Sequence, residues 1–92
     1  MLEPYVVTLC WGYPYDKAVG AKQTEVSLLE PTTPHMLLSE MVRRYPSLEA
    51  ALEPNRKGNI TAFVCMEKRV LTMQHPIAET CALHIMPPLS GG

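Results

Sequence analysis

The chain lacks the features that mark membrane, secreted and nucleic-acid-binding proteins. No apolar run approaches the roughly 20 residues needed to span a bilayer, so no membrane segment is predicted. Residues 1–4 do not begin a basic region followed by an apolar stretch, so no secretory signal is expected. The net charge of -1 gives no field that would attract a polyanion. Nucleic acid and membrane are therefore not expected partners.

Side chains with catalytic or metal-binding chemistry are few and scattered. Three cysteines without a spacing motif argue against a disulfide framework and favour a reducing, cytoplasmic location. All three fall in predicted strands, where a free cysteine is usually a small buried hydrophobe. The three histidines lie in separate elements without metal-ligand spacing, and no glycine-rich phosphate loop is present, so no metal site is predicted. These residues are Cys10, Cys65, Cys81, His35, His75 and His84.

The composition that remains is that of one folded domain. The chain has 92 residues, of which 47% are hydrophobic and 18% charged, and we predict a single domain over residues 1–92. Residues rich in β-branched and aromatic types predict a first strand at 5–11 and a second at 25–29. The polar segment 17–24 predicts a long hairpin loop with a bend at Gly20.

A helix is predicted after the second strand. Thr33 can cap it, and Pro34 suits the first helical position because its missing donor would be unsatisfied there in any case. Pro46 ends it, and a short second turn is predicted over 48–52. The apolar residues that share one helical face are Leu37, Leu38, Met41, Val42 and Tyr45.

Three further strands are predicted after a loop at 55–59. They cover residues 60–66, 69–73 and 81–86, with a tight connection at 67–68 and a crossing loop at 74–80. The element order predicts an α+β fold, with a mixed sheet of about five strands and one main helix packed on one face. The first and last strands could lie in parallel at the sheet centre, which is the β-grasp (ubiquitin-like) arrangement. Periodicity supports the elements without proving that topology.

The last strand alternates between two faces. Cys81, Leu83 and Ile85 are predicted to face the core. Ala82, His84 and Met86 are then predicted to lie on the open face of the sheet. This second set is a candidate partner surface, because methionine is an adaptable contact residue; the alternative is an ordinary solvated face.

The six residues after this strand are the most informative part of the sequence. Pro87 and Pro88 end the sheet ladder at Met86 and favour an extended arm. At about 3.1 Å per residue, the six-residue tail at 87–92 could project its carboxylate roughly 19 Å. Because Gly91 and Gly92 lack a Cβ atom, the tip is narrow enough for a partner's active-site channel. The alternative is a chance ending, since two final glycines arise in roughly 1 of 200 chains.

The tail and two other segments resemble one known family. Residues 85–92 resemble the ending of the small subunit of molybdopterin synthase, a MoaD/ThiS-type ubiquitin-like sulfur carrier. Residues 44–52 and His75-Pro76-Ile77 are similar to that family's helix-ending segment and to its loop before the last strand. Two departures leave the pathway open. Ile85-Met86 replaces the frequent aromatic residues, and Glu79-Thr80 replaces an acidic Asp-Gly turn.

The resemblance implies a sulfur carrier that is not itself an enzyme. A ubiquitin-activating-type (MoeB/ThiF-like) enzyme would adenylate Gly92 with ATP and Mg, and a sulfur donor would then convert it to a thiocarboxylate. The tail would enter an acceptor such as the molybdopterin synthase large subunit. No cofactor would be bound permanently to the carrier. The resemblance assigns tail insertion to Pro87, Pro88, Leu89, Ser90 and Gly91.

Other functions share the same tail. The carrier could serve the synthesis of cysteine, a thiamin-type thiazole or a thiolated nucleoside. A ubiquitin-like modifier that forms isopeptide bonds with lysines would end in the same way. A plain interaction module with an incidental diglycine is the third class.

Overall fold

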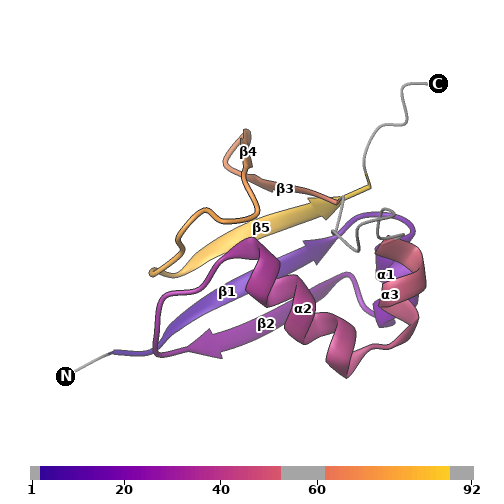
Figure 1. Cartoon of the computed structure of the whole chain (residues 1–92), viewed down its shortest axis with the longest axis horizontal. Helices are drawn as coiled ribbons and strands as arrows, with labels where there is room; N and C mark the ends of the chain where they lie inside the picture. Colours follow the sequence, from indigo (N-terminus) through magenta and orange to yellow (C-terminus); the bar gives the residue numbers. More distant parts are fainter. Residues whose placement is uncertain (1–2, 53–61, 88–92) are drawn as a thin grey trace.

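The computed structural model describes residues 3–52 and 62–87, and it forms one mixed sheet with helices on one face and at one end (Figure 1). Among these residues, no helix has the length and apolar character needed to cross a membrane. The elements in chain order are β1 (Tyr5–Trp11), α1 (Tyr15–Val19), β2 (Gln23–Leu28), α2 (Pro34–Arg44), α3 (Ser47–Leu52), β3 (Phe63–Met66), β4 (Arg69–Leu71) and β5 (Cys81–Met86).

The sheet has the strand order β2-β1-β5-β3-β4. β1 and β5, the first and last strands of the chain, pair in parallel at its centre, and Leu9 lies opposite Leu83. The other three pairings are antiparallel. This topology confirms the predicted β-grasp fold, because a hairpin lies on each side of one long-range parallel pairing.

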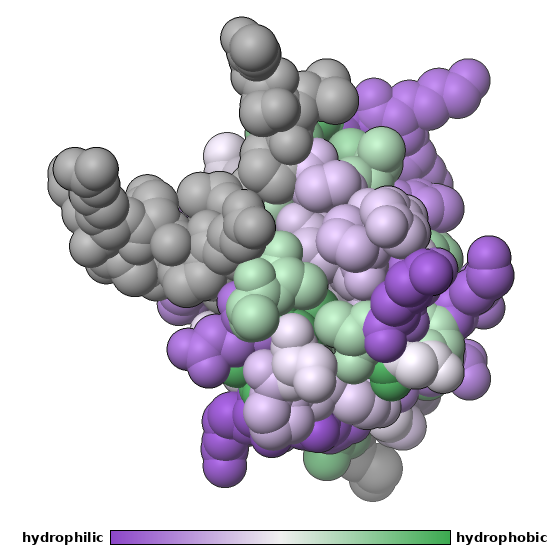
Figure 2. Space-filling view, turned by 90° about the vertical axis from the view of Figure 1, so that its right-hand side faces the viewer, coloured by the Kyte–Doolittle hydropathy of each residue, from purple (hydrophilic) through white to green (hydrophobic). Residues whose placement is uncertain are grey.

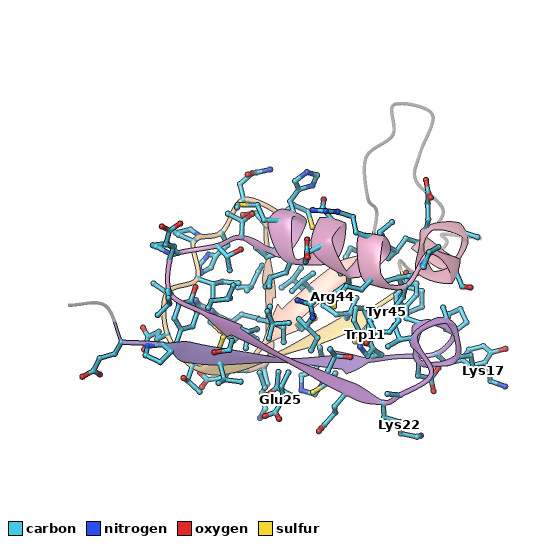
Figure 3. The ribbon with its side chains drawn as sticks, turned by 90° about the horizontal axis from the view of Figure 1, so that it is seen from below. Trp11, Lys17, Lys22, Glu25, Arg44 and Tyr45 are labelled. Atoms are coloured by element: carbon cyan, nitrogen blue, oxygen red, sulfur yellow. The ribbon has the colours of Figure 1, made fainter. Side chains whose placement is uncertain are left out.

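Helix α2 covers the core face of the sheet. The hydroxyl of Thr33 accepts a hydrogen bond from the backbone N–H of Met36 at 3.2 Å, so the predicted cap is confirmed. Figure 3 shows the helix as a separate layer beside the sheet, with Trp11 and Tyr45 between the two layers. The side chains buried beneath the helix include Leu37, Leu38 and Met41 from α2, and Val7, Leu9, Val64, Leu83 and Ile85 from the sheet.

The connection into α2 is tied to the crossing loop before β5. Thr32 and Ile77 exchange two backbone hydrogen bonds, each of 2.8 Å, in an isolated antiparallel bridge. The hydroxyl of Tyr5 lies 2.6 Å from the Glu30 carbonyl oxygen and 3.1 Å from that of Ile77. One tyrosine therefore joins the first strand to two loops that are distant in sequence.

The first hairpin differs from its prediction. Residues 17–24 were expected to form a loop, but a five-residue helix, α1, occupies Tyr15–Val19. Tyr15 and Val19, four residues apart, bury the same face of that turn, and Gly20 ends it with a left-handed φ of 83°. The helix is too short to give a periodic pattern in the sequence. Its five residues would not be stable as an isolated helix, so packing against the rest of the fold stabilises it.

Smaller differences concern strand ends. β2 begins at Gln23 rather than Glu25, since its first residues pair with the end of β1 although they are polar. β4 ends at Leu71 rather than Met73. The predicted short helix at 48–52 and the tight turn at 67–68 are confirmed. The predicted loop at 55–59 and the start of the strand at 60–66 lie outside the described residues.

We expect Tyr5→Phe to lower the free energy of unfolding by about 1–2 kcal/mol, because two carbonyl groups lose a buried hydroxyl partner. Chemical denaturation monitored by circular dichroism measures the loss. Tyr13→Phe is the matched control, because the Tyr13 side chain is 70% exposed. Equal stabilities of the two variants would contradict this role for Tyr5.

Candidate functional site

The central strand β5 leads directly into the predicted tail. Its last pairing is Met86 with Phe63 of β3, and Pro87, which has no backbone donor, follows at once. The sheet therefore ends where the prolines predicted it would. Pro87 is exposed. The predicted roles of residues 88–92, Gly92 included, concern a segment outside the described residues and stay predictions.

The base of the tail lies against the end of β1. The backbone N–H of Gly12 donates to the carbonyl oxygen of Ile85 at 2.8 Å, which extends the parallel ladder by one bond beyond Trp11. A Cβ atom on Gly12 would lie 3.0 Å from that same oxygen. The end of β1 and the base of the tail are thus packed backbone against backbone.

The predicted partner surface lies on the open face of the sheet. Ala82, His84 and Met86 are all exposed, whereas Leu83 and Ile85 between them are buried, so the predicted alternation is confirmed. Cys81, predicted as a core residue, is only half-buried because it lies at the strand's outer end, although it packs against the core. Whether a partner binds this face stays a prediction.

Neighbouring strands enlarge this face with residues that the sequence analysis did not select. His84 lies between Cys10 of β1 and Cys65 of β3 in one cross-strand row, and Cys65 in turn pairs with Val70 of β4. Phe63 and Met86, which are 41% and 48% exposed, form a cross-strand pair at the end nearest the tail. The alternation of residues along the predicted strand could have placed Phe63 on the open face. Its neighbours on β5 depend on the register between the two strands, which no local sequence pattern fixes.

The end of the molecule from which the tail leaves also carries α1 and α3, which pack against each other. Figure 2 views this end face-on. Weakly polar residues lie at its centre with apolar residues among them, and strongly hydrophilic residues lie toward the periphery. Tyr13 is exposed here, and the Lys17 ammonium lies 5.6 Å from its ring centroid. That distance is within the range of a cation–π contact.

A surface hollow of about 520 Å³ lies at the opposite end of β5. Burial, and then the negative charges of Glu79 and Glu67, raise the pKa of the Cys81 thiol. Cys81 is therefore less nucleophilic at neutral pH than an ordinary thiol. The hollow is lined by Met66, Glu67, Cys81 and residues 75–80.

Metal-binding side chains do not gather in the described part of the chain. Across residues 3–52 and 62–87, no group of three or more histidine, cysteine, aspartate or glutamate side chains has an arrangement suited to a metal ion. In the row that contains His84, the two cysteines lie on opposite sides of it, two strands apart.

Solved structures with the same architecture are known. The chain is similar to small archaeal modifier protein 1 (SAMP1) from Haloferax volcanii, with 19% identity, a TM-score of 0.78, and 95% of this chain and 99% of that one covered. The chain has the β-grasp fold. The same protein from Methanosarcina acetivorans is 16% identical, with a TM-score of 0.71 and coverage of 98% and 99%.

A third similar structure is that of a candidate molybdopterin converting factor, subunit 1, from Pyrococcus furiosus. It is 12% identical, with a TM-score of 0.72 and coverage of 92% of this chain and 99% of that one. At these identities the likeness concerns the β-grasp fold, and at that level it confirms the resemblance inferred from the tail. No family model and no curated protein sequence matches the chain.

We expect Cys81 to react with iodoacetamide at pH 8 more slowly than the same cysteine in an unfolded peptide, because its raised pKa leaves less thiolate present. Peptide mass mapping over time separates Cys81 from the other two cysteines. Glu79→Gln removes one of the causes of the raised pKa, so part of the rate should return. A rate equal to that of the peptide would contradict the raised pKa.

Proposed function

We propose that this chain is a sulfur-carrier protein whose Gly92 carboxylate is adenylated, converted to a thiocarboxylate and used to donate sulfur in molybdopterin synthesis. The observation that carries the proposal is the position of β5. The strand before the Pro-Pro-Leu-Ser-Gly-Gly tail is the central strand of a β-grasp sheet, and it runs out of the sheet at Met86. Pro87, the first residue of the predicted tail, is thus joined directly to the central strand of the sheet.

The proposed chemistry needs no catalytic side chain on the carrier. A carboxylate oxygen of Gly92, ionised at neutral pH because an α-carboxyl group has a pKa near 3.5, attacks the α-phosphorus of ATP and releases pyrophosphate. Sulfide then attacks the acyl carbon and AMP leaves, which gives the thiocarboxylate. The partner enzyme supplies ATP, Mg and the active site. The carrier supplies reach and a surface to be recognised.

The open face of the sheet is the surface that we propose the partners recognise. Its exposed apolar pair, Phe63 and Met86, adjoins the base of the tail, so a partner bound there would receive the tail beside its own contact surface. Ala82 and His84 continue the same strand face. Exposed apolar side chains grouped beside a functional segment are typical of a contact site. We propose a MoeB/ThiF-like activating enzyme and a molybdopterin synthase large subunit as its partners.

A ubiquitin-like modifier is the second candidate, because two of the similar structures are of proteins named small archaeal modifiers. In that case a lysine amine would attack the acyl carbon of the Gly92 adenylate, an isopeptide bond would form, and AMP would leave. The two functions share the adenylation step and differ in the acceptor. Conjugates of increased mass in cells that express a tagged chain would support the modifier.

We expect the chain ending at Gly92, incubated with an activating enzyme, ATP, Mg and sulfide, to gain the mass that corresponds to replacement of one oxygen by sulfur. Intact-protein mass spectrometry measures this change. A variant lacking Gly91 and Gly92 is the control and should remain unmodified. If the full chain forms neither an adenylate nor a thiocarboxylate with an activating enzyme from its own organism, the proposal is wrong.

We expect Met86→Asp to weaken binding to that activating enzyme by at least roughly tenfold, because a charge would replace an apolar contact of the proposed interface beside the base of the tail. Isothermal titration calorimetry gives the Kd. Met36→Asp makes the same change at an exposed methionine of α2, on the other side of the sheet from the open face, and should leave the Kd nearly unchanged. Similar losses in both variants would count against the open face as the docking site.

A further inference from the structure

Strand β2 forms one edge of the sheet. It pairs with β1 on one side, and within the described part of the chain no strand pairs with its other side. Figure 3 looks onto this edge, with β2 in front and the side chains of Lys22 and Glu25 close to it. The strand at the other edge, β4, has three residues, whereas β2 has six. β2 therefore presents the longer row of backbone groups that another strand could pair with.

The hydrogen bonds to β1 determine which peptide groups of β2 point outward. The N–H of Trp11 donates to the carbonyl oxygen of Lys22 at 2.8 Å, which continues the register of the pair. In an antiparallel pair, residues that bond to the partner strand alternate with residues that do not, so the even-numbered residues of β2 bond to β1. The odd-numbered residues then direct their N–H and carbonyl groups away from the sheet. These residues are Gln23, Glu25 and Ser27.

A second copy of this chain fits that edge in one register. Two antiparallel copies of β2 must place outward-pointing residues opposite one another, so the two-fold axis passes through a residue of the strand. With the axis at Val26, Glu25 of each copy lies opposite Ser27 of the other. The same register brings the exposed Lys22 of each copy opposite the exposed Glu30 of the other, at both ends of the interface. Opposite charges that face each other across two strands favour pairing.

The neighbouring registers are less favourable. An axis at Glu25 would place that carboxylate opposite its own copy, and like charges directly opposite destabilise a strand pair. An axis at Ser27 would bring Gln23 opposite Pro31, which has no N–H to donate. An axis at Thr24 would oppose only the first three residues of β2 to one another. The register described above is therefore the one that combines a long overlap with complementary charges.

Apolar surface lies at the end of the same edge. A hollow of about 400 Å³ is lined by residues 27–32 and Met36. Leu29 and Met36 are both large apolar residues that are exposed there. With the axis at Val26, Gln23 of the second copy lies opposite Leu29, so the start of its β2 strand is brought beside the hollow. Pairing would thus remove apolar surface from water at both ends of the interface.

We propose that this chain forms a weak homodimer through antiparallel pairing of two β2 strands about Val26. The two five-stranded sheets then form one continuous sheet, with α2 of both copies on the same face. β5 is separated from the interface by β1 and β2, so the open face beside β5 stays accessible in the dimer. The inference does not depend on the proposed carrier function.

Sedimentation equilibrium tests the dimer directly. One chain has a mass of 10.3 kDa. The average mass should rise toward twice that value between about 10 µM and about 1 mM, because interfaces smaller than roughly 1,200 Å² are typical of weak complexes. A chain that is still monomeric at about 1 mM would overturn the proposal.

Charge reversal tests the register. Lys22→Glu introduces a negative charge opposite Glu30 at both ends of the interface, so the Kd for dimerisation should rise roughly tenfold or more. The double variant K22E/E30K restores opposite charges and should return the Kd to within about threefold of the wild-type value. Within one chain the two residues lie beyond opposite ends of β2, so the fold should not change. A wild-type Kd for the single variant, or no recovery in the double variant, would contradict the proposed pairing.

Proline at the edge tests the backbone pairing. Ser27→Pro removes an outward-pointing N–H and keeps the bonds to β1, and proline is tolerated in this position of an edge strand. The variant should be monomeric at about 1 mM with an unchanged circular dichroism spectrum. Val70→Pro is the matched control, because it makes the same change at an exposed residue of the other edge strand and should leave the dimer intact. A folded Ser27→Pro variant that still dimerises would rule out pairing through β2; if it does not fold, the charge variants decide.

Discussion

The parallel pairing of β1 with β5 is the contact on which the rest of the structure depends. It joins residues more than 70 positions apart, such as Val7 and Cys81, and places the two ends of the chain's folded part at the sheet centre. Closing such a long loop costs conformational entropy before any contact offsets it. Burial of apolar side chains on the two paired strands offsets this entropy cost. These side chains, which lie beneath α2, are Val7, Leu9, Leu83 and Ile85.

This pairing also holds the residues that precede the tail. A tail attached to an edge strand would be held on one side only, but β5 has β1 on one side and β3 on the other. At its end, Phe63 pairs with Met86 on one side, and Gly12 bonds the Ile85 carbonyl on the other. The body up to Pro87 is therefore supported from both neighbours.

The two faces of β5 differ in exposure. The buried face, with Leu83 and Ile85, stabilises the fold, while the exposed face, with His84 and Met86, is free for a partner. Because the strand period is two residues, a register shift of one residue would bury the second set and expose the first. Core packing thus determines which side chains are available beside the tail. The fold and the proposed docking face are set by the same register.

The sequence by itself determined the elements with strong local signals. Thr33 and Pro34 marked the start of α2, the alternation at 81–86 marked both faces of β5, and Pro87 marked the end of the sheet. The tail motif also supplied the functional hypothesis, since its chemistry depends on residue types rather than on contacts.

Only the tertiary structure decided what depends on long-range contacts. The helix α1 forms because Tyr15 and Val19 find a buried site that five residues cannot predict from propensity. The cross-strand neighbours of the tail, Phe63 among them, follow from a register that no local pattern fixes. The hydrogen bond of 2.8 Å from the Gly12 N–H to the carbonyl oxygen of Ile85 likewise joins residues 73 positions apart in the chain. Local sequence signals therefore determined the elements and the functional hypothesis, whereas packing between distant segments decided which side chains lie beside the end of β5.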